Sequence, residues 1–240
     1  MRILITNDDS ISSPVLIPLV QWAQKLGEVV VVVPKFEQSG KSHSIELHKP
    51  FEVLPYELLP GVRAYTVDSS PADCVRYALL GLHEKFDLVI SGINKGFNIG
   101  MDILYSGTVS AAFESVCLGG KALAISTDNV SFDSALAHLD EVWSIIEKHK
   151  LFEKNDIYNV NIPPEVKGVR FTRQGGPYYS DEFPSVGNNL VSPTGVCVYE
   201  EGHDYSVDTD AVLHGYISIS PLVPERTNMP LFRELSQLNP

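Results

Sequence analysis

Residues 2–10 read R-I-L-I-T-N-D-D-S, and this stretch predicts both the fold class and the place of a functional site. Residues 2–6 form a short run of branched apolar side chains, which is typical of a buried β-strand. Asp8 and Asp9 follow its carboxyl end without a spacer. Two adjacent carboxylates repel each other and lose hydration beside an apolar core, so a bound cation would stabilise them. One of them could instead cap the next helix while the other stays solvated, and these residues alone leave both interpretations open.

The first two thirds of the chain repeat the alternation of strand and helix. Apolar runs predict further strands at 29–33, 64–67, 87–91 and 123–126, and helical spacing predicts helices at 15–26, 70–82, 108–118 and 132–146. Short apolar strands that alternate with helices indicate a parallel sheet covered by helices on both faces. We therefore predict an α/β fold, a Rossmann-like three-layer arrangement, with residues 1–155 as its core.

The sequence changes character beyond residue 155. Proline and glycine become frequent, and three short strands are predicted at 169–173, 196–200 and 216–220. The chain ends in a short amphipathic helix over 231–238, which is too small to be stable alone. We expect this helix to dock elsewhere, on another subunit among the options. Residues 156–240 are predicted to complete the sheet of the same single domain and to form oligomer contacts.

Composition narrows the class of partner and the compartment. The formal net charge is −12, from 18 basic and 30 acidic side chains, which argues against a nucleic-acid polymer or an anionic membrane as partner. A small phosphate ligand stays possible, because one cation reverses the local field. The three cysteines are an odd count without C-x-x-C spacing, as in reduced core thiols. The opening residues lack a secretory leader pattern, so we expect a cytoplasmic protein with no membrane span.

A glycine-rich loop and a helix start follow the strand predicted at 87–91. Residues 91–100 read S-G-I-N-K-G-F-N-I-G, a spacing that excludes the dinucleotide-binding fingerprint. Asn94 and Asn98 offer amide oxygens and donors within this loop. Ser106, Gly107 and Thr108 then open a helix, whose free backbone N–H groups form a ready anion site. A plain glycine-rich turn with a Ser/Thr cap is the alternative interpretation.

A third polar loop, residues 37–44, follows the strand at 29–33. It contains G-K-S, but lysine occupies the place of the first P-loop glycine, so a Walker motif is excluded. Lys41 or His43 could meet a phosphate, and His43 is a candidate general acid. Without Cys/His ligand spacing, the oxygen donors favour Mg²⁺, Mn²⁺ or Ca²⁺. A cation beside an oxyanion site is the layout of metal-assisted phosphoryl hydrolysis.

Several motifs in one order carry a family resemblance. They are N-D-D after the first strand, Q-S-G-K-S-H-S after the second, then P-A-D-C-V, S-G-I-N-K-G-F-N-I-G and Y-S-G-T-V-S-A-A-F-E. This series resembles the SurE (survival protein E) family, whose members are metal-dependent phosphatases of nucleoside monophosphates. The match runs from residue 1 to about 126 and continues more loosely through N-V-N-I-P, F-T-R-Q and G-Y-I-S-I-S-P-L.

The resemblance implies a function and a set of site residues. Residues 1–155 become a catalytic core that hydrolyses nucleoside 5′- or 3′-monophosphates with one divalent cation per subunit. The expected metal ligands are Asp8, Asp9, Ser39 and Asn94, of which Asp8, Asp9 and Asn94 are also assigned to catalysis, and the expected phosphate-binding residues are Asn98, Ser106, Gly107, Thr108, Ser42 and His43. A broader phosphatase or exopolyphosphatase, or a nucleotide sensor without turnover, are the alternatives.

The resemblance also implies a mode of assembly, and the sequence departs from the family pattern at two places. Family members form dimers by exchanging C-terminal segments, sometimes paired into tetramers, so we expect an exchanged β-hairpin and helix extension. The usual glycine after N-D-D is Ser10 here, and Ser69-Ser70-Pro71 replaces the usual G-T-P. If the family glycine holds a left-handed conformation, Ser10 introduces strain or a shifted loop.

Overall fold

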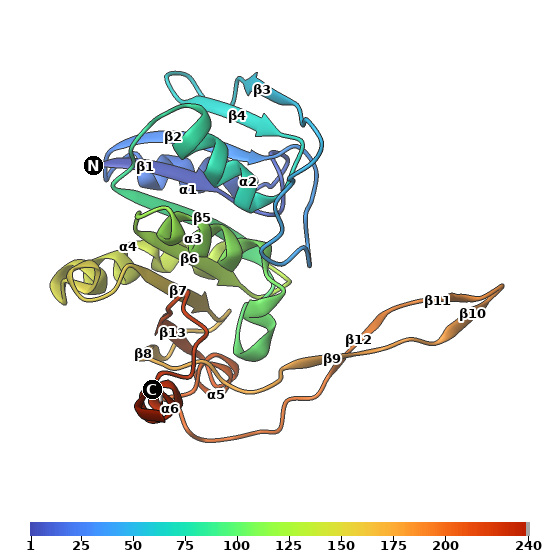
Figure 1. The fold of residues 1–240 in the computed structure, drawn as a ribbon. Helices are drawn as coiled ribbons and strands as arrows, with labels where there is room; N and C mark the ends of the chain where they lie inside the picture. Colours follow the sequence, from blue (N-terminus) through green and yellow to red (C-terminus); the bar gives the residue numbers. More distant parts are fainter. Residues whose placement is uncertain (239–240) are drawn as a thin grey trace.

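The computed structural model describes residues 1–238, whose main feature is a nine-stranded sheet in the order β3-β4-β2-β1-β5-β6-β7-β13-β8 (Figure 1). Its six central strands, β4 to β7 in that order, pair in parallel. Their bounds are Arg2–Thr6 (β1), Glu28–Pro34 (β2), Arg63–Val67 (β4), Leu88–Lys95 (β5), Ala122–Thr127 (β6) and Ile157–Ile162 (β7). The strand order reverses between β1 and β5, as in doubly wound folds. The predicted parallel α/β sheet is therefore confirmed.

Helices cover both faces of this sheet, which gives the predicted three layers (Figure 1). Successive strand residues point to opposite faces, so β1 contributes to two cores. Ile3 and Ile5 belong to the core under α1 (Leu16–Ala23) and α4 (Asp133–Lys148). Leu4 belongs to the second core, under α2 and α3. The bounds on that face are Pro71–Arg76 for α2, continued by a π-helical turn over Tyr77–Gly81, and Gly107–Cys117 for α3.

The edges of the sheet come from the second half of the chain and from one early strand. β3 (Val53–Tyr56) is antiparallel to β4, β13 (Tyr216–Pro221) is antiparallel to β7, and β8 (Gly168–Phe171) is parallel to β13. The predicted strands at 169–173 and 216–220 match β8 and β13 closely. Sequence patterns missed β3, β7 and the short helix α5 (Asp208–Leu213). Two asparagines at alternate positions interrupt the apolar pattern of β7.

Two short ribbons form an arm that projects from the body of the protein (Figure 1). Its strands are β9 (Tyr179–Glu182) paired with β12 (Thr194–Cys197), and β10 (Ser185–Gly187) paired with β11 (Leu190–Val191). We call residues 179–197 the hairpin arm. The strand predicted at 196–200 overlaps only the end of β12, because the arm is almost wholly exposed and carries no buried pattern.

The remaining elements are short. Single 3₁₀ turns lie at Gly100–Leu104 and Leu151–Glu153, and the chain closes with α6 (Met229–Leu235) and a 3₁₀ turn at Ser236–Leu238. This last helix lies within two residues of its predicted start, and its apolar side chains are exposed. Within residues 1–238, no helix combines the length and the apolar character that crossing a membrane requires.

Candidate functional site

A cavity of about 470 Å³ opens at the carboxyl ends of β1 and β5, where the strand order reverses. Open α/β sheets bind ligands at this position. The loops after β1, β2 and β5, the start of α3 and the base of the hairpin arm all reach it. Its lining residues are Asp8, Ser39, Gly40, Asn94, Lys95, Phe97, Asn98, Asp102, Tyr105, Ser106, Tyr179, Ser180 and Asp181. The structure thus brings together residues that the sequence placed on separate strand ends.

Asp8 is buried against the first turn of α3. Its Oδ1 accepts a hydrogen bond from the Thr108 hydroxyl at 2.5 Å, and the backbone N–H of Thr108 also donates to the carboxylate. Gly107 allows this approach, since a Cβ there would lie 2.9 Å from Asp8 Cβ. Burial raises the pKa of Asp8, while the hydrogen bonds from Thr108 oppose that shift. The first turn of α3 therefore donates hydrogen bonds directly to the Asp8 carboxylate.

Asp9 has a carboxylate oxygen that lacks the polar partner a buried oxygen normally has. Its Oδ2 is buried and has no hydrogen-bond partner among residues 1–238. Burial, followed by the charge of Asp8, raises the pKa of Asp9 to about 6, while the backbone N–H of Lys95 works in the opposite direction. Buried polar atoms are normally satisfied, so an orphaned oxygen on Asp9 beside the buried carboxylate of Asp8 fits a bound cation.

Ser39 and Asn94 complete the oxygen donors at this end of the sheet. The backbone N–H of Gln38 donates to the Asp8 carbonyl at 2.8 Å, which holds the loop after β2 against the loop after β1. The Ser39 hydroxyl donates to Glu37 Oε1 at 2.7 Å. Asn94 Nδ2 donates to the Gly96 carbonyl at 2.7 Å, which fixes the orientation of the amide that carries Oδ1. The four predicted metal ligands offer only oxygen atoms, the donor type that Mg²⁺ and Mn²⁺ prefer.

A bulge in β5 puts Asn94 at the cavity. The pairing of β5 with β6 shifts register between Ser91 and Asn94, so the strand continues to Lys95 instead of ending at Ser91 as predicted. Gly92 has a φ of +135°, and a Cβ there would lie 2.3 Å from the Ile125 carbonyl oxygen. Bulges of this kind redirect side chains at functional sites.

Asn98 is held by polar side chains that the sequence analysis did not select. Its backbone N–H donates to Asn161 Oδ1 at 2.8 Å, its carbonyl accepts from Asn159 and Asn161, and its Nδ2 donates to Ser126 Oγ at 2.8 Å. Two fully buried asparagines on one strand, β7, are the sequence signal that could have identified this support. Asn98 is thereby fixed at the lining of the cavity.

The predicted phosphate-binding residues at the start of α3 have different surroundings. Ser106 lines the cavity and caps the helix, since its Oγ accepts from the Val109 backbone N–H at 3.0 Å. Thr108 is fully buried, and its hydroxyl proton goes to Asp8. The Thr108 hydroxyl is therefore occupied by the Asp8 carboxylate. A phosphate at this helix start would contact the neighbouring residues and not the Thr108 side chain.

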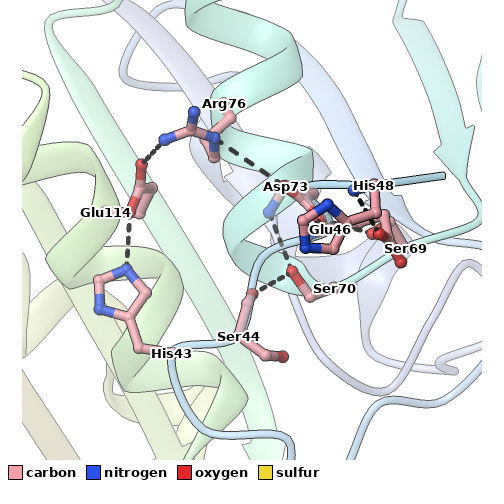
Figure 2. A network of polar contacts seen from close by, with 9 residues as sticks. All are labelled: His43, Ser44, Glu46, His48, Ser69, Ser70, Asp73, Arg76 and Glu114. Carbon is pink, nitrogen blue, oxygen red and sulfur yellow. Dashed lines mark hydrogen bonds and ion pairs between the residues drawn. The ribbon is translucent and has the colours of Figure 1, made fainter. Parts of the chain in front are cut away.

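His43 lies in a second cavity, of about 420 Å³, with Glu114, Phe113, Cys117 and Arg226 among its lining residues. Figure 2 shows its ring directed at Glu114: Nε2 and Oε2 are 2.7 Å apart, and Arg76 Nη1 donates to the other carboxylate oxygen at 2.9 Å. Ser42 is tied to the loop before α3, because its N–H donates to the Tyr105 carbonyl at 3.0 Å. The structure groups His43 with Glu114 and Arg76, apart from the cavity that Asp8 lines.

The base of the hairpin arm and helix α5 contribute to the site from the far side. Tyr179, Ser180 and Asp181 line the Asp8 cavity, and the sequence analysis missed all three. Asp208 on α5 accepts from the backbone N–H groups of Gly100 and Gly175 at 3.0 and 2.8 Å. Burial raises the pKa of Asp208, and these backbone donors oppose the shift. Asp208 thus joins the glycine-rich loop to the segment that leads into the arm.

Comparisons with known proteins agree on one family. A family model described as survival protein SurE matches residues 3–181. The protein named 5′-nucleotidase SurE from Natranaerobius thermophilus is 35% identical over 98% of both chains, and that from Desulforudis audaxviator is 39% identical over 95% of this chain and 93% of its own. The crystal structure of the SurE protein from Aquifex aeolicus superposes with a TM-score of 0.79 at 33% identity and covers 99% of both chains.

Proposed function

Because the chain belongs to the SurE family of survival proteins, we propose that it is a metal-dependent phosphomonoesterase, a 5′-nucleotidase that hydrolyses nucleoside monophosphates at the Asp8 cavity. Its relatives carry the name 5′-nucleotidase SurE. The observation that supports this activity most directly is the pair of adjacent carboxylates at the switch point: Asp8 is buried, and the half-buried Asp9 has an orphaned oxygen. Such a pair needs a cation, and the adjacent cavity has room for a substrate.

The metal site that we propose consists of Asp8, Asp9, Ser39 and Asn94, with one Mg²⁺ or Mn²⁺ per subunit. Two carboxylates and two neutral oxygens leave coordination positions open for water and substrate. When bound, a divalent cation supplies Lewis acidity and lowers the pKa of a coordinated water. The part of the protein is to hold these donors: Thr108 orients Asp8, and Gly96 fixes the amide of Asn94.

The phosphate of the substrate is proposed to lie between Asn98 and the start of α3. Asn98 is fixed from three sides and lines the cavity, and Ser106 reaches it from the helix start. The helix dipole and the start of α3 around Gly107 favour negative charge there, while the hydroxyl and the backbone N–H of Thr108 already donate to Asp8. Ser42 and His43 have weaker geometric support for this role, since His43 is paired with Glu114.

The first test is metal-stripped protein assayed for phosphate release from 5′-AMP and 3′-AMP, with and without added Mn²⁺ or Mg²⁺. We expect activity only with metal, and loss of it in Asp8→Asn. Turnover that persists after stripping would contradict the metal-dependent mechanism. Faster release from other phosphomonoesters or from short polyphosphate would favour a broader phosphatase. Tight nucleotide binding without release over hours would identify a sensor.

We further propose that the protein works as a homodimer, or as a tetramer of two such dimers, in which the C-terminal segments are exchanged. The hairpin arm projects from the body (Figure 1), and Phe183, Val186 and Leu190 on it are more than 60% exposed. Helix α6 likewise leaves Phe232 and Leu235 about half exposed. Light scattering on the full chain and on a Phe232→Ser/Leu235→Ser variant tests this, and a monomeric wild-type protein would contradict it.

The cytoplasm is the proposed compartment. Cys74, Cys117 and Cys197 are all free thiols in the structure; Cys74 is fully buried, whereas Cys117 and Cys197 are exposed and not in the core as expected. Free thiols persist in reducing compartments. Fractionation of the producing cells tests this assignment. Recovery of the protein among secreted or envelope proteins would contradict it.

A further inference from the structure

Three metal-ligating side chains converge at the root of the hairpin arm, away from the Asp8 cavity. Glu201 and His203 lie on the segment between β12 and α5, and His214 caps the C-terminal end of α5. One ligand atom from each lies within 4.8 Å of the other two. We propose that these residues form a second metal site, which takes Zn²⁺ or a similar borderline divalent ion.

The hydrogen bonding of His214 leaves one ring nitrogen free to act as a ligand. His214 Nδ1 lies 2.8 Å from the Asp210 carbonyl oxygen, which can only accept, so Nδ1 carries the proton. In the neutral ring the lone pair is then on Nε2, which lies 3.4 Å from Glu201 Oε1. Metal-ligating histidines usually donate their other N–H to a carbonyl or carboxylate in this way, because the bond fixes the tautomer and the ring orientation. His214 thus already has the arrangement of a ligand.

The segment that carries the other two ligands is tied to the same helix. The Asp210 carboxylate accepts from the Tyr199 hydroxyl at 2.8 Å and from the Asp204 backbone N–H at 3.0 Å. The ring of Tyr205 lies 5.1 Å from that of His214, and the ring of His203 lies 5.4 Å from it. Because these contacts hold the segment on both sides of His203, little rearrangement is needed to close the three ligands around an ion.

The donor chemistry separates this site from the one at Asp8. Two imidazoles and one carboxylate suit Zn²⁺, with water in the fourth position, whereas four oxygens suit Mg²⁺ or Mn²⁺. The bound ion would join the segment after β12 to α5. Since β9 pairs with β12 and carries Tyr179 to Asp181 into the Asp8 cavity, the second ion would stiffen the root of an element that lines the first site.

The test is equilibrium dialysis of the full-length protein against Zn²⁺, with excess Mg²⁺ present to occupy the oxygen site. We expect wild type to bind one more Zn²⁺ per chain than His203→Ala, and Zn²⁺ affinity at this site to fall at least about 100-fold, the upper end of the cost of losing an outer-shell partner. Glu201→Gln should also lower the affinity of this site for Zn²⁺. His48→Ala, which removes another exposed histidine, is the matched control and should bind as wild type does.

Two readouts keep this test decisive. Circular dichroism confirms that the variants are folded, which is expected because Glu201 and His203 are exposed. Co²⁺ replacing Zn²⁺ should give visible absorption bands of a nitrogen-ligated ion in wild type and lose them in His203→Ala. Equal Zn²⁺ uptake by wild type and His203→Ala would overturn the proposal and leave a Glu201–His214 ion pair as the role of the cluster.

Discussion

The Thr108 hydroxyl donates a hydrogen bond to Asp8 Oδ1 at 2.5 Å, and this contact joins the start of helix α3 to the end of strand β1. Both side chains are buried, so water does not replace the bond readily. Gly107 permits the close approach, since a side chain there would collide with Asp8. The contact thus fixes the carboxylate that we assign to the metal, and Thr108 acts as a positioning residue for it.

Replacing Thr108 by valine should weaken the metal site without changing its ligands. Valine keeps the shape and removes the hydroxyl, so Asp8 loses the bond that orients it. We expect the concentration of Mn²⁺ needed for half-maximal activity to rise about 10- to 100-fold. Thr108→Ser keeps the hydroxyl and should stay close to wild type. If the valine variant is activated by Mn²⁺ just as wild type is, Thr108 does not position the ligand.

Asp9→Asn should remove most turnover and yet stabilise the metal-free protein. Burial and Asp8 together raise the pKa of Asp9 to about 6, so at pH 7 its ionised carboxylate destabilises the fold when no cation is bound. Removing the charge should therefore raise the Tm of the stripped protein, which corresponds to a gain in the free energy of unfolding on the order of 1 kcal/mol. Activity with Mn²⁺ should fall by on the order of 10²-fold or more.

The control for this prediction is Asp156→Asn, which removes an exposed carboxylate and should change neither quantity. Thermal unfolding in the presence of a chelator gives the first readout and phosphate release with Mn²⁺ the second. If metal-free Asp9→Asn melts at a lower temperature than metal-free wild type, the ionised Asp9 carboxylate does not destabilise the metal-free fold.

The central sheet was predictable from sequence because its strands are buried on both faces. Apolar runs such as residues 29–33 are typical of buried parallel strands. Asp8 and Asn94 come shortly after two such runs, so their meeting at one cavity follows from the parallel order, whereas Asp9 lines a neighbouring cavity together with Lys95. Strand β7 was not predicted, because Asn159 and Asn161 interrupt its apolar pattern. These two side chains hydrogen-bond to the backbone of Asn98. A site requirement overrode the local pattern there.

The hairpin arm and the surroundings of His43 could not be predicted from local patterns. The arm has no buried face within one chain, so no alternation marks its strands, and its approach to the cavity depends on the path after β8. His43 is three residues from Gly40, which lines the Asp8 cavity, yet its ring points to Glu114 on α3, which also accepts from Arg76 on α2 (Figure 2). Only the packing of those helices decides that direction.

Ser10→Gly should stabilise the protein. Ser10 has a φ of +74°, so the left-handed conformation expected for the family glycine is kept here by a residue with a Cβ. That conformation costs roughly 1 kcal/mol for a side-chain-bearing residue. The Ser10 hydroxyl recovers part of this through its 2.8 Å contact with Ser12 Oγ. We expect a net gain of about 0.5–1 kcal/mol, which denaturant unfolding at constant m value would measure.

A second substitution at Ser10 separates the cost of the backbone conformation from the side-chain contacts. Ser10→Ala keeps the Cβ and loses the Ser12 contact, so it should be less stable than wild type. If Ser10→Gly is also less stable than wild type, the hydroxyl contact outweighs the backbone cost and the strain argument fails.

Glu114→Gln should make the stability of the protein less dependent on pH in the acid range. Burial alone would raise the pKa of Glu114, but the hydrogen bonds from His43 and Arg76 outweigh it and lower the pKa below the usual 4.5. A carboxyl whose pKa is lower in the folded state contributes stability above its unfolded pKa. That contribution is lost as pH falls through the folded value.

The difference in stability between wild type and Glu114→Gln should therefore be largest near neutral pH, at about 1–3 kcal/mol. It should shrink below pH 4.5, because a protonated glutamate and a glutamine are both neutral. Thermal unfolding from pH 3.5 to 7.5 measures this, with the exposed Glu147→Gln as control. A difference that stays constant over this range would mean that the network in Figure 2 stabilises the loop by shape and not by the charge of Glu114.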